Sequence, residues 1–102
     1  GPLVGVGMGG IYVEVLKDIA FRLAPISVQE VHEQLRSIRT YPLLAGVRGE
    51  APADIAAIED TVLRVNQLVT DFPEIVEMDI NPLVVHNEGE GAIVLDARII
   101  LQ

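Results

Sequence analysis

Two stretches of the 102-residue chain carry apolar residues at the spacing of an α-helix. In the first stretch these residues are Val28, Val31, Leu35 and Ile38. In the second they are Ile55, Ile58, Val62, Val65 and Val69. This spacing puts one apolar stripe on each helix, and each stripe must be buried against another layer. The pattern therefore predicts two amphipathic helices that share a core with the segments flanking them.

Both helices have sequence signals at their ends. Ser27 and Glu30 have the spacing of a capping box, in which each side chain accepts a hydrogen bond from the other residue's backbone N–H. Pro52 is typical of a helix start, and Pro73 ends the second helix because proline has no N–H to continue it. The intervening Thr40–Gly49, which contains proline and glycine, is predicted to be a loop.

The segments on either side of the helices are typical of β-strands. Ile11–Leu16 is rich in β-branched and aromatic residues, and Ile19–Leu23 follows a short turn, so a hairpin is expected here. Glu77–Val85 and Ala92–Leu101 are predicted strands around a turn rich in glycine and glutamate. Strand pairs segregated from helices predict an α+β fold with a mainly antiparallel sheet and two helices. The apolar content of 50% fits one domain spanning the whole chain.

The charge of the chain limits its partners. Fifteen acidic residues against seven basic ones give a net charge of −8, which argues against a nucleic-acid backbone or an anionic membrane surface. No apolar run reaches the roughly 18 residues of a membrane span. The absence of cysteine excludes a disulfide scaffold and a cysteine nucleophile. A cytoplasmic-type domain is expected, and a nucleotide stays compatible because magnesium supplies positive charge.

The glycine run Gly5–Gly10 formally matches the GxGxxG pattern. A dinucleotide site needs a strand before this run and a helix after it, whereas here a strand is predicted to follow. A loop that lets phosphate approach the backbone and a flexible turn both stay open. Of the two histidines, His32 lies off the apolar stripe and is expected to be exposed. For His86, beside the last turn, a structural role is favoured over a phosphate carrier.

Three polar residues share one face of the first strand in the last hairpin. Alternate residues of a strand point to the same side, so Glu77, Asp79 and Asn81 lie together, opposite Met78 and Ile80. By itself this is also the pattern of the solvent-facing side of an antiparallel sheet.

The geometry of the hairpin favours a more specific interpretation. If the turn is centred on Glu88-Gly89, Asn81 lies opposite Asp96, and Asp79 lies opposite Arg98. An amide oxygen and a carboxylate side by side are hard oxygen donors of the kind that Mg²⁺ takes. This register therefore predicts a magnesium pair at Asn81 and Asp96, which a slip of one residue would separate.

Five segments carry a resemblance to a known family: Gly7–Asp18, Phe21–Pro25, Leu43–Gly49, Asp79–Leu83 and Leu95–Arg98. Together they resemble the last part of the ATP-grasp domain in ADP-forming acetyl-CoA synthetases. The likeness covers nearly the whole chain and extends, more distantly, to the β subunit of succinyl-CoA synthetase.

The resemblance implies an enzyme that interconverts acyl-CoA, ADP and phosphate with a carboxylic acid, CoA and ATP through a phosphohistidine. It implies that Asn81 and Asp96 hold Mg²⁺ and that Asp79 lies beside the phosphate and the phosphohistidine, a role compatible with an ion pair to Arg98. It also places four residues on the side of the ATP/ADP cleft: Gly7, Gly9, Gly10 and Glu14.

By the same resemblance, the other ATP-grasp lobe, the CoA-binding and ligase domains and the phosphate-carrying histidine belong to other parts of the enzyme. Those parts are the expected partners, an oligomer is compatible, and the chain alone is expected to be inactive. The main alternative is a non-catalytic interaction or regulatory remnant, as in acetyltransferase fusions. A free-standing magnesium or nucleotide module is disfavoured, because half a clamp has only one wall.

Overall fold

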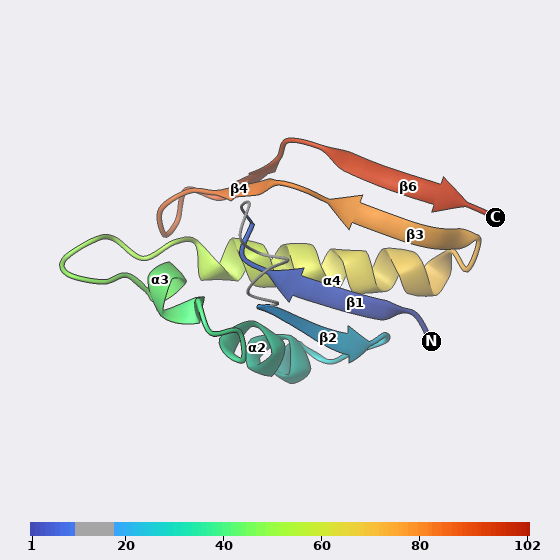
Figure 1. Ribbon diagram of the computed structural model, residues 1–102, viewed down its shortest axis with the longest axis horizontal. Coiled ribbons are helices and arrows are strands. Elements are labelled where there is room, and N and C mark those ends of the chain that lie inside the picture. The colour runs from blue at the N-terminus through green and yellow to red at the C-terminus, as the bar shows by residue number, and fades with distance from the viewer. Residues whose placement is uncertain (10–17) are drawn as a thin grey trace.

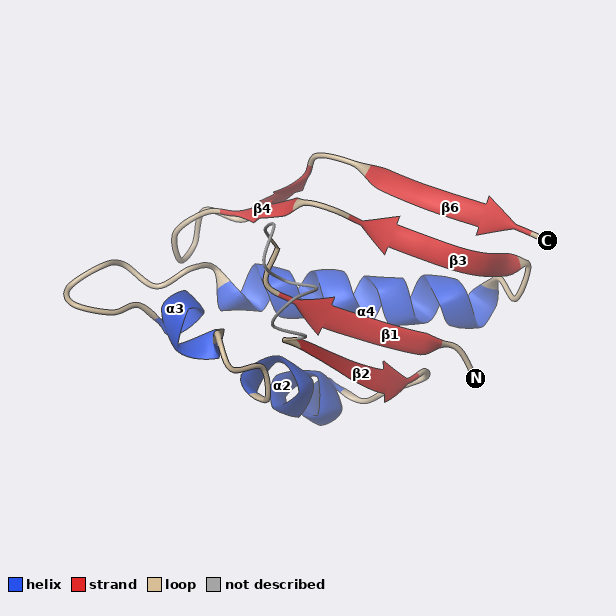
Figure 2. Ribbon diagram, in the orientation of Figure 1, coloured by secondary structure: helices blue, strands red, loops and turns tan. Residues whose placement is uncertain are grey.

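A computed structural model describes residues 1–9 and 18–102 of the protein. The elements in these ranges are β1 (Leu3–Gly7), β2 (Ile19–Leu23), α2 (Val28–Arg36), α3 (Tyr41–Ala45), α4 (Ile55–Asp71), β3 (Ile75–Ile80), β4 (Leu83–Val85), β5 (Ala92–Val94) and β6 (Ala97–Leu101). The described strands pair antiparallel as β1–β2, β3–β6 and β4–β5 (Figure 2). The predicted α+β class is confirmed.

The core lies where α2 and α4 pack on each other and on β1 and β2 (Figure 1). Its buried apolar residues are Val4, Ala24, Val31, Leu35, Ile38, Ile58 and Val62. Five of these seven belong to the two helical stripes predicted from the sequence. Burial of these side chains removes apolar surface from water and is the main force that holds the helices on the strands.

A buried glutamine connects α2 to both strands of the first pair. Gln34 has an exposed fraction of 0%. Its side-chain amide donates to the backbone oxygens of Val4 and Ala20, at 2.9 and 3.0 Å. A buried amide without partners would be costly, so these two bonds fix where the helix sits along β1 and β2.

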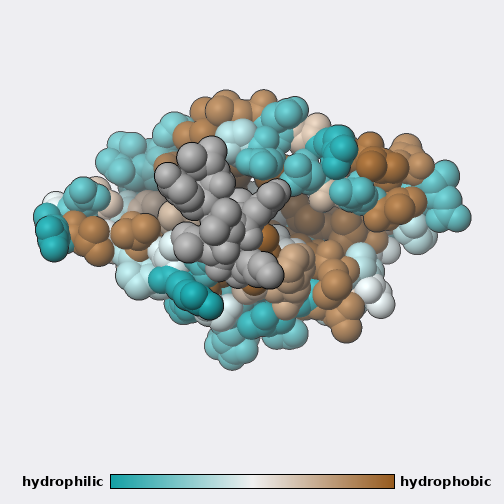
Figure 3. All heavy atoms as spheres, viewed as in Figure 1, coloured by the Kyte–Doolittle hydropathy of each residue, from teal (hydrophilic) through white to brown (hydrophobic). Residues whose placement is uncertain are grey.

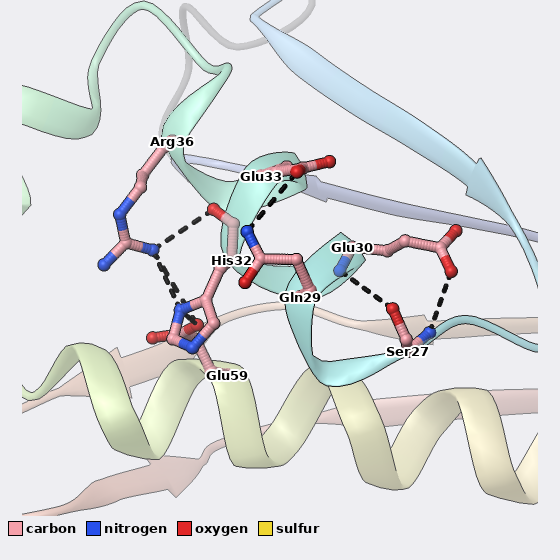
Figure 4. Close-up of polar contacts among 7 residues, drawn as sticks. All are labelled: Ser27, Gln29, Glu30, His32, Glu33, Arg36 and Glu59. Atoms are coloured by element: carbon pink, nitrogen blue, oxygen red, sulfur yellow. Dashed lines mark hydrogen bonds and ion pairs between the residues drawn. The ribbon is translucent and has the colours of Figure 1, made fainter.

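Polar contacts also connect the two long helices (Figure 4). The buried Glu59 carboxylate of α4 forms ion pairs with His32 and, at 3.8 Å, with Arg36 of α2. The expectation that His32 is simply solvent-exposed is therefore wrong, because its half-exposed ring contacts a carboxylate of the neighbouring helix. An acidic residue on the buried side of α4 needs partners for its charge, and α2 provides the Arg36 guanidinium and the His32 ring.

The predicted capping box is present, but the second helix begins in a way that the sequence analysis missed. The Ser27 hydroxyl accepts from the Glu30 N–H, and the Glu30 carboxylate accepts from the Ser27 N–H, both at 3.1 Å. The cap of α4 is Asp54, whose carboxylate accepts from the N–H groups of Ala57 and Gly91, at 3.1 and 2.8 Å. Asp54 therefore ties the start of α4 to the turn of the last hairpin.

The first strand differs from expectation. Gly5 and Gly7 were expected in a loop or turn, but they lie within β1, which pairs with β2 in the register Gly5↔Phe21. Among the described residues β1 is thus the partner of β2, whereas the predicted strand Ile11–Leu16 lies outside those residues. Glycine favours turns and weakens the interior of a strand, so the composition of this segment indicated a turn, whereas pairing with β2 makes it a strand.

Two further expectations need correction. A third helix, α3, replaces part of the predicted loop Thr40–Gly49, with a proline at its start. The last hairpin is also not continuous, because it divides into two strand pairs on either side of Asn81-Pro82. Proline lacks the N–H that a continuous ladder requires, which accounts for the interruption. No helix in the described ranges is long and apolar enough to cross a membrane.

We expect Leu35→Ala to lower the free energy of unfolding by about 3 kcal/mol, because it leaves a cavity between α2 and α4. The control is Leu43→Ala in α3, where the side chain is 57% exposed. This variant should change stability by less than about 0.5 kcal/mol. Urea unfolding followed by circular dichroism measures both, and equal losses would contradict the assignment of the core.

Asp18 makes stability depend on pH. A hydrogen bond from the Thr40 hydroxyl, with further bonds from the N–H groups of Thr40 and Arg39, lowers the pKa of its carboxyl below 3.8. The charged form is favoured in the folded state, so this contribution is present at neutral pH and is lost as the pH falls through the lowered pKa. The urea concentration at the unfolding midpoint of the wild type should fall below pH 5. We expect this fall to be smaller in Asp18→Asn, whereas an exposed control, Asp60→Asn, should show the same fall as the wild type.

Candidate functional site

Asn81 and Asp96 lie opposite each other in the last hairpin, each between two strands of its own segment. On one side of them Asp79 pairs with Arg98, and on the other Leu83 pairs with Val94, in one continuous register. The Asn81 N–H donates to the Asp96 carbonyl oxygen at 3.1 Å. The predicted register about Glu88-Gly89 is therefore confirmed, although both residues lie at the interruption between strands.

The two faces of β3 differ as predicted. Met78 and Ile80 are half-buried, whereas Glu77, Asp79 and Asn81 are exposed. Arg98 lies opposite Asp79 in the register, but its guanidinium forms an ion pair with Glu77, at 3.3 Å. Within residues 1–9 and 18–102, Asp79 takes part in no ion pair, so its carboxylate stays available for another group.

A cavity of about 490 Å³ brings several predicted site residues together. Gly7 and Gly9 line it from β1 and the residues that follow it, and Asp79 and Asn81 line it from β3 and its end. Figure 3 shows this face of the molecule, with apolar residues around a hollow. Two further predicted residues, Gly10 and Glu14, lie outside the residues that the structure describes.

The floor of this cavity is apolar, and its residues were not among those predicted for the site. Leu35 of α2 and Ile58, Val62 and Val65 of α4 line it together with Val4. In the sequence, the helical residues of this floor belong to the apolar stripes. Such a stripe predicts that its residues are buried, but it does not predict which cavity they line. The site thus combines an apolar floor with a few polar groups at one side, as ligand sites commonly do.

The donor set is chemically suited to a small hard cation. The Asn81 side chain offers an amide oxygen and the Asp96 side chain a carboxylate, and both residues are exposed. In the described part of the chain, no group of three or more His, Cys, Asp or Glu side chains gathers around one point. Two oxygen donors fit Mg²⁺, which keeps waters and substrate phosphates as its other ligands.

The glycines of β1 are not equivalent. A Cβ at Gly5 would lie 2.7 Å from the Phe21 ring, and a Cβ at Gly7 would lie 2.8 Å from the backbone oxygen of Asp18. A Cβ at Gly9 would meet nothing within 4 Å among the described atoms. The packing between β1 and β2 thus explains why positions 5 and 7 are glycine. It does not require glycine at position 9.

The sequence is similar to a known family and to proteins of known identity. The sequence pattern of the ATP-grasp domain matches residues 1–101. The chain is 52% identical, over 101 residues, to the ADP-forming acetate–CoA ligase I of Archaeoglobus fulgidus, covering 99% of this chain and 14% of that protein. It is 50% identical to the β subunit of the ADP-forming acetate–CoA ligase II of Pyrococcus furiosus, covering 100% of this chain and 44% of that subunit.

Solved structures have the same fold. A protein of Pyrococcus horikoshii superposes with a TM-score of 0.93 at 50% identity, covering 98% of this chain and 42% of that one. The dinucleotide-forming acetyl-coenzyme A synthetase 1 of Candidatus Korarchaeum cryptofilum, in complex with coenzyme A and Mg-AMPPCP, has a TM-score of 0.93 at 42% identity. That match covers 100% of this chain and 47% of the other. The chain thus spans from a seventh to less than half of these relatives.

Alanine substitutions at Gly7 and Gly9 test which of the two glycines is required for packing. We expect Gly7→Ala to lower the free energy of unfolding by about 1–3 kcal/mol, because the new methyl group would collide with the backbone of Asp18. Gly9→Ala should change it by less than about 0.5 kcal/mol. Urea denaturation of the two variants checks this, and a Gly7→Ala variant as stable as the wild type would refute the close approach.

Proposed function

Because the chain belongs to the ATP-grasp domain family, we propose that it forms the part of an ADP-forming acid–CoA ligase that holds the magnesium–nucleotide during phosphoryl transfer. One observation carries the proposal: Asn81, which lines the cavity together with Gly7 and Asp79, is joined backbone to backbone with Asp96. The names of the relatives support the reaction class. Since the chain spans only part of each of them, the activity is proposed for the longer protein.

The polar residues take distinct roles in this proposal. The Asn81 amide oxygen and the Asp96 carboxylate would hold Mg²⁺, which supplies positive charge against the phosphates. Asp79 would accept the N–H of the phosphate-carrying imidazole, so that the other ring nitrogen faces the phosphate. Gly7, Gly9 and Gly10 would let phosphate oxygens approach the backbone, with Glu14 on the same side of the cleft.

In this proposal the other groups that the reaction needs belong to other parts of the enzyme. The second wall of the nucleotide clamp, the CoA site and the phosphohistidine would come from other domains or subunits, consistent with relatives that are larger or are named β subunits. Positioning supplies most of the catalysis in phosphoryl transfer. ATP, ADP and CoA are metabolites of the cytoplasm, which is therefore the proposed location.

In the full-length ligase we expect Asp96→Asn to lower kcat by about 100-fold or more, because the substitution removes a charged metal donor. The matched control is His86→Ala, which should stay within a few-fold of wild type. His86 contributes only backbone bonds to the described structure, to Asp54 and Gly91. Acyl-CoA formation is measured at saturating Mg²⁺ and ATP, with urea unfolding alongside.

Each outcome of this experiment has a separate meaning. Full activity in Asp96→Asn would contradict the metal assignment and would favour a non-catalytic interaction role for this domain. A large loss of stability would show that Asp96 is structural. Loss of phosphoenzyme labelling in His86→Ala would show that this histidine carries the phosphate.

A further inference from the structure

The β4–β5 hairpin has little apolar packing to fix its orientation. Its two strands form a sheet of their own, separate from β3–β6 in the described part of the chain. None of the residues of β4 and β5 is fully buried, and Val84, Ile93 and Val94 are exposed. Val85 packs against the core from its edge. Polar contacts therefore have to contribute to the placement of this hairpin.

Asp54 connects the turn of this hairpin to the start of α4, beside which the turn lies in Figure 1. Asp54 is only 8% exposed. One of its carboxylate oxygens accepts from the Ala57 N–H at 3.1 Å, inside the helix, and the other accepts from the Gly91 N–H at 2.8 Å, directly before β5. Its backbone N–H donates to the His86 carbonyl oxygen at 2.8 Å, directly after β4. One residue thus binds both ends of the turn and the first turn of a 17-residue helix.

The carboxylate is charged when it makes these contacts. The N–H groups of Gly91 and then of Ala57 lower the pKa of the Asp54 carboxyl below 3.8, against burial, which raises it. Hydrogen bonds to a charged acceptor are stronger than those between neutral groups. Because each oxygen has its own N–H partner, the bond to the hairpin is separate from the cap of the helix.

The other end of the hairpin is the junction that carries the proposed metal ligands. Two backbone bonds close this junction, from the Asn81 N–H to the Asp96 oxygen and from the Leu95 N–H to the Pro82 oxygen, both at 3.1 Å. β4 and β5 have three residues each. At about 3.3 Å per residue, roughly 10 Å of strand separates the junction from the turn. So short a hairpin moves as a unit, and a tilt at its turn reaches the junction.

We propose that Asp54 is a positioning residue for the Asn81–Asp96 pair, because its bond to Gly91 fixes the orientation of β4–β5 relative to α4. Without this bond the hairpin would tilt, and the backbone dihedral angles next to Asn81 and Asp96 would change. Groups that orient metal ligands without touching the metal typically contribute about 10- to 100-fold to metal affinity. The inference rests on the proposed function for the metal, whereas the attachment of the hairpin does not.

Asp54→Ser in the full-length ligase separates the bond to the hairpin from the cap of the helix. Serine also caps helices well, but its single, shorter side-chain oxygen cannot serve both Ala57 and Gly91. We expect the Mg²⁺ concentration for half-maximal acyl-CoA formation to rise at least about tenfold, with kcat at saturating Mg²⁺ within about threefold of wild type. The matched control is Ser27→Ala, which removes the cap of α2 and should leave the Mg²⁺ dependence within about twofold.

Hydrogen–deuterium exchange without metal or nucleotide measures the junction itself. In Asp54→Ser the amides of Asn81 and Leu95 should exchange at least about tenfold faster than in the wild type, whereas the amide of Leu35 in α2 should change by less than about twofold. Asp54→Asn keeps the length of the side chain but offers one acceptor oxygen instead of two. It should give the same pattern, and it replaces the serine variant if that variant does not fold.

The other outcomes overturn the inference. Equal acceleration at the junction and at Leu35 would mean a general loss of stability. Unchanged exchange at the junction would mean that Asp54 does not hold the hairpin, and faster exchange with an unchanged Mg²⁺ dependence would mean that the hairpin does not position the metal pair. Full activity of Asp96→Asn would instead contradict the proposed function, so the two failures are distinguishable.

Discussion

The packing of α2 against α4 is the contact on which the strand pair β1–β2 and the divided last hairpin both depend. Leu35 is buried between the helices, and Gln34, its neighbour in sequence, bonds the backbones of both β1 and β2. At the start of α4, Asp54 bonds the turn of the last hairpin through Gly91. The helix pair thus fixes one hairpin by a buried amide and the other by a capping carboxylate. A shift of one helix along the other would change the width of the cavity between the hairpins.

The candidate site depends on this arrangement because its residues come from both hairpins. Gly7 belongs to β1, while Asp79 and Asn81 belong to β3 and its end. Among the described residues, β1 and β3 make few direct contacts across the cavity, so their spacing is set through the helices beneath. Exposed acidic and amide groups beside an apolar floor also suit a ligand that is partly flat and partly charged, as a nucleotide is.

Local patterns predicted much of the fold, whereas contacts between distant segments escaped prediction. The helical stripes and the Ser27 capping box depend on neighbours within a few residues, and both are present. The pairing of Asn81 with Asp96 was also predictable, because a short turn fixes the register of a hairpin. The roles of Gln34 and Asp54 could not be predicted, since Gln34 bonds Val4, 30 residues away in sequence, and Asp54 bonds Gly91, 37 residues away. For β1, glycine content suggested a turn, but pairing with β2 makes it a strand.

The hydrogen bond between the backbones of Asn81 and Asp96 has a consequence for motion. Two residues whose backbones are directly bonded keep the separation of their backbone positions when the segment that carries them is displaced. Opening or closing of an enzyme around its substrate would therefore carry both oxygen donors as one rigid body. If the two residues hold Mg²⁺ as proposed, the ion would move together with them, and its distance to groups on the other lobe would vary.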